Sequence, residues 1–236
     1  MRNTAKLIAS CVVVTSATGL FAQVNQVPVA QNVVQLSANG SIDVAQDLLT
    51  MVLGTNRDGA DAATVQSQLK VAVDAALLEA KKSAQPGQMD LRTGAFSLYP
   101  RYGKDGKPIG WQGTAELIVE GRDFARISTL AGKIRTLTVS SVSFSLSTEQ
   151  RTQVEAQAQA LAIERFKTNA SLIAKGFGFS SYSLREVNVN SNEQGYAPAP
   201  RMMAMASKMA MDEAPVPVVA GKTSVVVNVS GSVQLK

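Results

Sequence analysis

The sequence predicts an α+β fold with two lobes, in which amphipathic helices pack on a mainly antiparallel sheet. Three observations carry this prediction. A long helical pattern spans residues 147–178, runs of alternating polarity precede and follow it, and Asp105-Gly106 lies between two further alternating runs. Asp-Gly between such runs is a strong signal for a β-hairpin, and hairpins interspersed with helices are typical of α+β proteins.

The first expected strand begins at Val33 and alternates apolar and polar residues as far as Val44. Gly40 interrupts this alternation, which predicts a bulge or a tight bend. A second short strand is expected over residues 47–55. The Asn-Arg-Asp-Gly run at 56–59 then predicts a turn.

An amphipathic helix is expected from Asp61 to the Gln-Pro-Gly run at 85–87, which ends the pattern. Its apolar residues recur at every third or fourth position, and this spacing places them on one face. The expected buried face comprises Val65, Leu69, Ala72, Val73, Ala76 and Ala80.

The hairpin is expected to pair residues 94–99 with residues 111–119 around a turn at 104–107. Asp123 can then cap a short helix that ends at Gly132. In the strand that follows, over residues 137–146, the apolar residues change parity. A bulge near Ser140-Ser141 would keep all of them on the buried face.

The long helix begins with a capping-box spacing, because Ser147 and Gln150 can each satisfy a backbone N–H at the helix start. Gly176 and Gly178 supply the left-handed stop. The expected apolar face of this helix comprises Val154, Ala158, Leu161, Ala162, Phe166, Leu172 and Ile173.

Two strands are expected after the long helix. The first, over residues 182–190, has mixed polarity, with Val187 and Val189 facing inward. The second, over residues 223–235, alternates almost without fault and is the clearest strand of the chain.

The N-terminus has the pattern of a secretory signal: a basic start at Arg2 and Lys6, an apolar run at 7–18 and a small-residue cleavage site ending at Ala22. Residues 1–22 are therefore expected to be a signal peptide, residues 23–32 a tether and residues 33–236 the folded domain, with a Met/Pro-rich insert at 191–220. No later apolar run approaches the ~20 residues that cross a bilayer.

Cleavage would remove Cys11, the single cysteine, so the mature chain would have no disulfide. It would also lower the formal net charge from +5 to +3, because 21 basic residues would then face 18 acidic ones. The remaining basic residues are scattered. The chain is therefore not expected to bind nucleic acid.

The residue types argue against most enzymatic mechanisms. The chain has no histidine, which excludes Ser-His and Cys-His nucleophiles and zinc sites that rely on His. Asp43 with Asp47, and Glu149 with Glu155, are the candidate carboxylate pairs, but a solvated surface or a helix start explains them more simply. We expect no enzyme, no catalytic residue, no metal site and no cofactor.

Gly221-Lys222-Thr223 imitates the end of a phosphate-binding loop. However, Val216 stands where the first glycine belongs, and a strand follows instead of a helix.

A methionine-rich segment lies between prolines in the insert and contains Met202, Met203, Met205, Met209 and Met211. Thioethers are soft ligands for Cu(I) and reversible sinks for oxidants. Flexible thioethers also pack adaptably against a neighbouring subunit. The sequence leaves these three roles open.

Two further features have alternative interpretations. The hairpin tip Tyr99–Lys107 sets Tyr99 and Tyr102 beside Arg101, Lys104 and Lys107, a combination that can bind an anionic polymer, a lipid headgroup or a partner protein. A solvated hairpin end is the simpler interpretation, because three cations make only a small patch. The alanine-rich long helix can pack either within one subunit or between subunits.

Several of these features, in this order and spacing, resemble the SIMPL-domain family. They are Leu36-Ser37-Ala38-Asn39-Gly40, Tyr99-Pro100-Arg101-Tyr102 with Gly110-Trp111, Asp123-Phe124, Val142-Ser143-Phe144-Ser145-Leu146-Ser147, the glycine-terminated helix, the Pro/Met-rich insert and the final valine strand. The resemblance spans about residues 33–236. The chain departs from the family at residues 44–47, where many members have Pro-Asp, and at Trp111, which is commonly Tyr.

The resemblance implies a two-lobed α+β fold, secretion to the periplasm or outer membrane, a link to oxidative stress and ring-like homo-oligomers. The family has no established enzymatic activity. We therefore expect a non-enzymatic, oligomeric periplasmic protein that acts as a structural or interaction module of the envelope, in peripheral contact with the outer membrane. The alternative is a protein that binds Cu(I) or a small ligand, or scavenges oxidants, through the methionine-rich segment.

Overall fold

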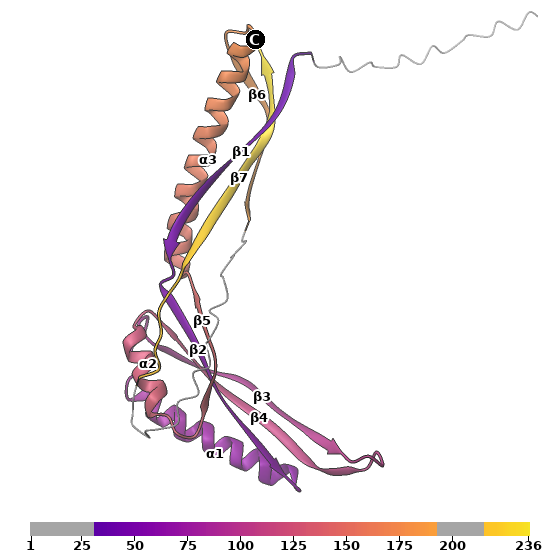
Figure 1. Ribbon diagram of the computed structural model, residues 1–236, viewed down its shortest axis with the longest axis vertical. Coiled ribbons are helices and arrows are strands. Elements are labelled where there is room, and N and C mark those ends of the chain that lie inside the picture. The colour runs from indigo at the N-terminus through magenta and orange to yellow at the C-terminus, as the bar shows by residue number, and fades with distance from the viewer. Residues whose placement is uncertain (1–30, 193–214) are drawn as a thin grey trace, which may run out of the picture. The chain divides into compact units, whose positions relative to one another are not determined.

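The computed structural model describes residues 31–192 and 215–236 (Figure 1). The expected signal peptide, most of the tether and the methionine-rich segment lie outside these residues. In order, the described elements are β1 (Val33–Ala45), β2 (Leu48–Gly59), α1 (Ala62–Lys81), β3 (Asp90–Tyr102), β4 (Pro108–Gly121), α2 (Phe124–Lys133), β5 (Thr138–Ser145), α3 (Thr148–Gly176), β6 (Tyr182–Asn192) and β7 (Lys222–Leu235).

The strands form two antiparallel sheets, one with the order β3-β4-β2-β5 and the other with the order β1-β7-β6. Each sheet has its own hydrophobic core. The predicted α+β fold of two lobes, with helices packed on antiparallel strands, is therefore confirmed.

Helix α1 covers the four-stranded sheet with the face that its sequence predicts. Val65, Leu69, Ala72, Val73, Ala76 and Ala80 are all buried, and they pack with Leu49, Met51 and Leu117 of the central strands. The helix begins where expected, because the carboxylate of Asp61 accepts a hydrogen bond from the N–H of Thr64 at 2.8 Å.

Strand β2 is longer than the sequence predicts. The turn expected at residues 56–59 is wrong, since Arg57 pairs with Gly113 and Gly59 pairs with Trp111 of β4. The ladder of the longer partner strand overrides the local turn preference of Asn-Arg-Asp-Gly, and the chain bends only at Ala60 and Asp61.

The bulge predicted in β5 is confirmed. Val52 pairs with Ser141 and Leu53 pairs with Val139, so Ser140 is the extra residue. The expected short helix is confirmed as α2, whose N-cap Asp123 accepts from the N–H of Arg126 at 2.9 Å. Residues 215–220, the end of the expected insert, place Val216 and Val218 against the core of this sheet.

Helix α3 packs mainly against β1 and β7 of the three-stranded sheet (Figure 1). The bulge or bend expected at Gly40 is wrong, because β1 pairs with β7 in unbroken register, with Gly40 opposite Val227. A Cβ on Gly40 would lie 2.0 Å from the carbonyl oxygen of Ala158. The glycine is therefore needed where the helix backbone approaches the strand.

The buried face of α3 is a row spaced mainly at i, i+4: Val154, Ala158, Ala162, Phe166, Ala170 and Ala174. The expectation that Leu172 is buried is wrong, since it is 62% exposed. Small alanines let the helix lie close to the strands, so the contact row is narrow. Gly178 has the expected positive φ of 81°, whereas Gly176 is the last helical residue and does not.

Strand β6 lies at the edge of its sheet, where α3 covers it little. Val187 and Val189, expected to face inward, are 45% and 43% exposed, so that expectation is wrong. The alternation of β7 is confirmed, with Val227, Val229, Val233 and Leu235 buried.

Candidate interaction surfaces

The first candidate surface is the outer edge of β6, which pairs only with β7 in the part of the chain that the structure describes. Leu184, Val187 and Val189 are exposed along it. A bulge at Arg185 interrupts the pairing with β7, but residues 186–192 pair regularly. This strand contains neither proline nor lysine, the residues with which natural proteins commonly protect sheet edges.

The other edge strands differ in the protective features that they carry. Strand β3 contains Pro100 and has a register shift between Thr93 and Phe96. Strand β5 is short and bulged. On β1, the guanidinium of Arg165 donates to the carbonyl oxygen of Asn39 at 2.9 Å. Strand β6 differs from β1, the other edge of its sheet, because it exposes the large apolar side chains of Leu184, Val187 and Val189, whereas no large hydrophobic residue of β1 is exposed.

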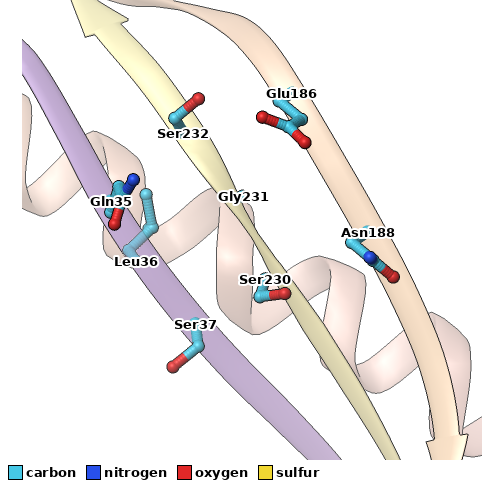
Figure 2. Close-up of a pocket in the computed structure, with 8 residues that line it drawn as sticks. All are labelled: Gln35, Leu36, Ser37, Glu186, Asn188, Ser230, Gly231 and Ser232. Atoms are coloured by element: carbon cyan, nitrogen blue, oxygen red, sulfur yellow. The ribbon is translucent and has the colours of Figure 1, made fainter.

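The second candidate surface is a polar trough on the face of the three-stranded sheet that is turned away from α3. Figure 2 shows its lining, which comprises Gln35, Leu36 and Ser37 of β1, Ser230, Gly231 and Ser232 of β7, and Glu186 and Asn188 of β6. The hollow has a volume of about 460 Å³.

Side-chain length explains why this face is hollow. The middle strand carries the short Ser230 and Ser232, while both flanking strands carry longer amides or a carboxylate (Figure 2). Hydroxyls and amides can donate and accept hydrogen bonds, and Glu186 is the single charged group of the lining. The sequence analysis missed the trough, because the polar alternation of three strands becomes one surface only when the strand order is known.

The third candidate surface is the tip of the β3–β4 hairpin. Strand β2 pairs with β4 no further than Trp111, so the hairpin tip, residues 101–110, extends beyond β2. Tyr102 and Ile109 are 63% and 60% exposed there, and Arg101, Lys104 and Lys107 are also exposed. The structure thus places Tyr102, Arg101, Lys104 and Lys107 of the predicted set at the tip, whereas Tyr99 pairs with Gln112 before the tip begins.

A polar junction joins the starts of three elements. The side chain of Asp47, between β1 and β2, accepts hydrogen bonds from the N–H and Oγ of Ser147 at 2.7 and 2.6 Å. Arg122, which follows β4, lies with its Nε 3.5 Å from Asp47 Oδ2 and also pairs with Glu149. The capping box is thus confirmed for Ser147, which accepts from the N–H of Gln150 at 3.3 Å, but Asp47 takes the reciprocal role expected of Gln150.

The environment of Asp47 affects its ionisation. Partial burial acts to raise the pKa of Asp47, but the two hydrogen bonds from Ser147 and the charge of Arg122 outweigh it, so the pKa lies below its ordinary value. The carboxylate therefore stays ionised over a wide pH range. It serves as a fixed cap for α3, which agrees with the helix-start interpretation of the candidate carboxylates.

The remaining sequence candidates do not converge on a site. Asp43 is exposed on β1, and Glu155 is partly exposed on α3. Lys222 and Thr223 open β7, as expected of a segment that is not a phosphate-binding loop. Within residues 31–192 and 215–236, no group of three or more His, Cys, Asp or Glu could hold a metal ion. The methionine cluster falls outside these ranges.

The structure also bears on membrane insertion. Of the three described helices, none is both long enough and apolar enough to cross a bilayer.

Comparison with known proteins gives one family match. The model described as "SIMPL: Protein of unknown function (DUF541)" matches residues 34–233. No curated protein matches the sequence.

Two solved structures resemble part of the chain. The crystal structure of AtUAH in complex with glyoxylate is 15% identical, with a TM-score of 0.25, and the match covers 56% of this chain and 34% of that one. The complex with (S)-hydroxyglycine is 16% identical, with a TM-score of 0.25 and coverages of 55% and 34%. The matched region is about a third of their length, and likenesses this weak carry no functional argument.

Proposed function

We propose, from the premise that this chain belongs to the SIMPL family of proteins of unknown function, that it is a non-enzymatic, secreted protein of the cell envelope that assembles with further copies of itself. The edge of β6 is the observation that carries this proposal. Among the described residues it combines backbone groups without a strand partner with alternating apolar side chains, which is the arrangement that strand addition uses.

The chemistry of β6 suits a second copy of the same strand or sheet. The strand contains one Arg and one Glu and is otherwise uncharged, so no net charge opposes its approach to an identical partner. Burying the exposed parts of Leu184, Val187 and Val189 would contribute about 2–4 kcal/mol. Backbone hydrogen bonds along the edge would add to this, each contributing about 0.5–1.5 kcal/mol.

The type of contact would set the form of the assembly. If β6 met β6 of the second copy, the contact would be two-fold and the product a dimer. If β6 met β1 at the other edge of the same sheet, the contact would be head-to-tail and could close into a ring. The ring agrees with the expectation from the family resemblance, and measured mass separates the two forms.

Secretion and location complete the proposal. The pattern of Arg2, Lys6 and the apolar run before Ala22 supports export, and the family resemblance supports the periplasm, peripheral contact with the outer membrane and a role in stress defence. N-terminal sequencing of the exported protein should begin at Gln23. An unprocessed chain that stays inside the cell would contradict this part.

Assembly is tested by light scattering after size exclusion over a wide concentration range. We expect a discrete mass of several subunits for the wild-type chain. Val187→Lys with Val189→Lys should shift it to the monomer mass, because two lysines on the edge repel and must stay hydrated.

The matched control is Val71→Lys with Leu78→Lys, which places the same charges on exposed apolar positions of α1. This variant should keep the wild-type mass. A wild-type chain that is monomeric at all concentrations, or an edge variant that stays folded and keeps the assembled mass, would refute assembly through β6.

A further inference from the structure

The hairpin tip, residues 101–110, carries an inference that rests on the membrane contact of the proposed function and assigns that contact to a site. We propose that the tip is a membrane-contact site that binds the surface of an anionic lipid bilayer. The two components of such a site are exposed side chains that can enter the interface and cations that are free to meet lipid phosphates.

The apolar component depends on a local distortion of the hairpin. Arg101 pairs with Gly110 and Tyr102 pairs with Pro108, so Ile109 is the extra residue of a bulge. Bulges redirect a side chain out of the regular alternation. Here Ile109 is exposed close to the turn and on the opposite strand from Tyr102, so an aliphatic and an aromatic side chain flank the same loop.

The turn holds these side chains in place. The N–H of Gly103 donates to the carbonyl oxygen of Lys107 at 2.8 Å. The N–H of Gly106 donates to the carbonyl oxygen of Gly103 at 3.0 Å. Gly106 has a φ of 73°, which a residue with a side chain rarely adopts. The loop is therefore closed by its own backbone hydrogen bonds.

The charged component surrounds the apolar one. Lys104 and Lys107 are exposed and form no ion pair with any residue that the structure describes. Arg101 has one distant partner, with its Nη1 3.8 Å from Asp58 Oδ1. Asp105 is the single acid of the loop, and its carboxylate accepts from the N–H of Lys107 at 3.3 Å. The tip thus has a net positive charge.

Size and chemistry favour a lipid surface over other partners. A specific protein interface engages about 20–30 residues a side, far more than this tip offers. A soluble polyanion would use the cations but gain little from Ile109. A bilayer interface uses both, because tyrosine places its hydroxyl among the headgroups while lysine stems extend toward the phosphates.

Vesicle co-sedimentation tests the site. The protein is used as it is recovered from expressing cells, and its N-terminus is verified to be the same in every variant. We expect binding to mixed phosphatidylglycerol–phosphatidylcholine vesicles, weaker binding to phosphatidylcholine alone, and loss of binding as salt is raised. Lys104→Gln with Lys107→Gln should lower the partition coefficient about thirtyfold, or about fivefold for each lysine.

A second variant separates the apolar component. Tyr102→Ser with Ile109→Ser should lower the partition coefficient about tenfold while circular dichroism stays that of the wild type. Lys167→Gln with Lys175→Gln removes two exposed lysines of α3, which packs on the other sheet, and should leave binding within about twofold of wild type, because charges outside the contact are screened.

The outcomes decide the proposal. Equal binding to anionic and neutral vesicles, or wild-type binding by either folded tip variant, overturns it. Binding to soluble polyphosphate that depends on the lysines, with no effect of Tyr102→Ser and Ile109→Ser on vesicle binding, would assign the tip to polyanions and also overturn it.

Discussion

Gly40 shows how a single hydrogen atom in place of a methyl group lets α3 lie on β1. A Cβ there would lie 2.0 Å from the carbonyl oxygen and 3.0 Å from the carbonyl carbon of Ala158, and 2.8 Å from the backbone nitrogen of Ala162. These are backbone atoms of a helix, so they cannot rotate away as a side chain can. The helix or the strand would have to shift.

Gly40→Ala is therefore expected to destabilise the protein by about 1–3 kcal/mol, the usual cost of overpacking, as measured by urea unfolding. Gly176→Ala is the matched control, since a Cβ there meets nothing within 4 Å. It should be stabilising by about 0.5–1 kcal/mol, because alanine restricts the unfolded chain. Equal effects of the two changes would contradict the close approach.

At the scale of elements, the start of α3 depends on a residue from another part of the chain. Asp47 lies about a hundred positions before the helix, yet its carboxylate binds both the N–H and the hydroxyl of the N-cap Ser147. Because the pKa of Asp47 is lower in the folded protein than its ordinary value, its contribution to stability is complete above the unfolded pKa of about 4 and is lost as the pH falls through the folded pKa.

Asp47→Asn should therefore destabilise the protein at neutral pH by about 1–3 kcal/mol, the range for a hydrogen-bonded charged group. The difference from wild type should narrow as the pH falls below about 4, because the carboxylate of the unfolded chain is protonated first and that of the folded protein only at lower pH. Urea unfolding from neutral to acidic pH measures this. The control is Asp43→Asn, an exposed change on β1, whose stability should stay within about 0.5 kcal/mol of wild type at neutral pH. If the loss of stability in Asp47→Asn were the same at every pH, the link between the ionisation of Asp47 and stability would be refuted.

The sequence predicts those elements whose signals are local. The buried face of α1, the cap at Asp123, the bulge at Ser140 and the Asp-Gly hairpin each follow from residues close together in the chain. The hairpin tip was located for the same reason. The extension of the tip beyond β2 was not predicted, because it depends on where β2 stops pairing with β4.

The errors arise where the answer depends on distant elements. Gly40 was interpreted as a bulge because the sequence does not show that a helix crosses the strand there. Val187 and Val189 were placed inward because alternation does not reveal that β6 is an edge strand that α3 covers little. The polar trough was missed because its three strands are far apart in sequence.

At the scale of the whole molecule, the edge of β6 and the hairpin tip belong to different sheets, so the two proposals can be tested together. Changes at one site should not alter the other directly. An assembly, however, would present several tips to one vesicle, and each tip after the first would bind at a high effective concentration.

The edge variant Val187→Lys with Val189→Lys should therefore bind anionic vesicles at least about a hundredfold more weakly than wild type, although its tip is intact, because avidity is lost with assembly. Val71→Lys with Leu78→Lys carries the same added charge. It should stay assembled and bind anionic vesicles as tightly as wild type. Conversely, Lys104→Gln with Lys107→Gln should lower the partition coefficient about thirtyfold and keep the assembled mass. Light scattering and co-sedimentation on the same samples measure both properties. An edge variant that is monomeric yet binds as tightly as the assembled control would show that a single tip is sufficient and that assembly serves another purpose.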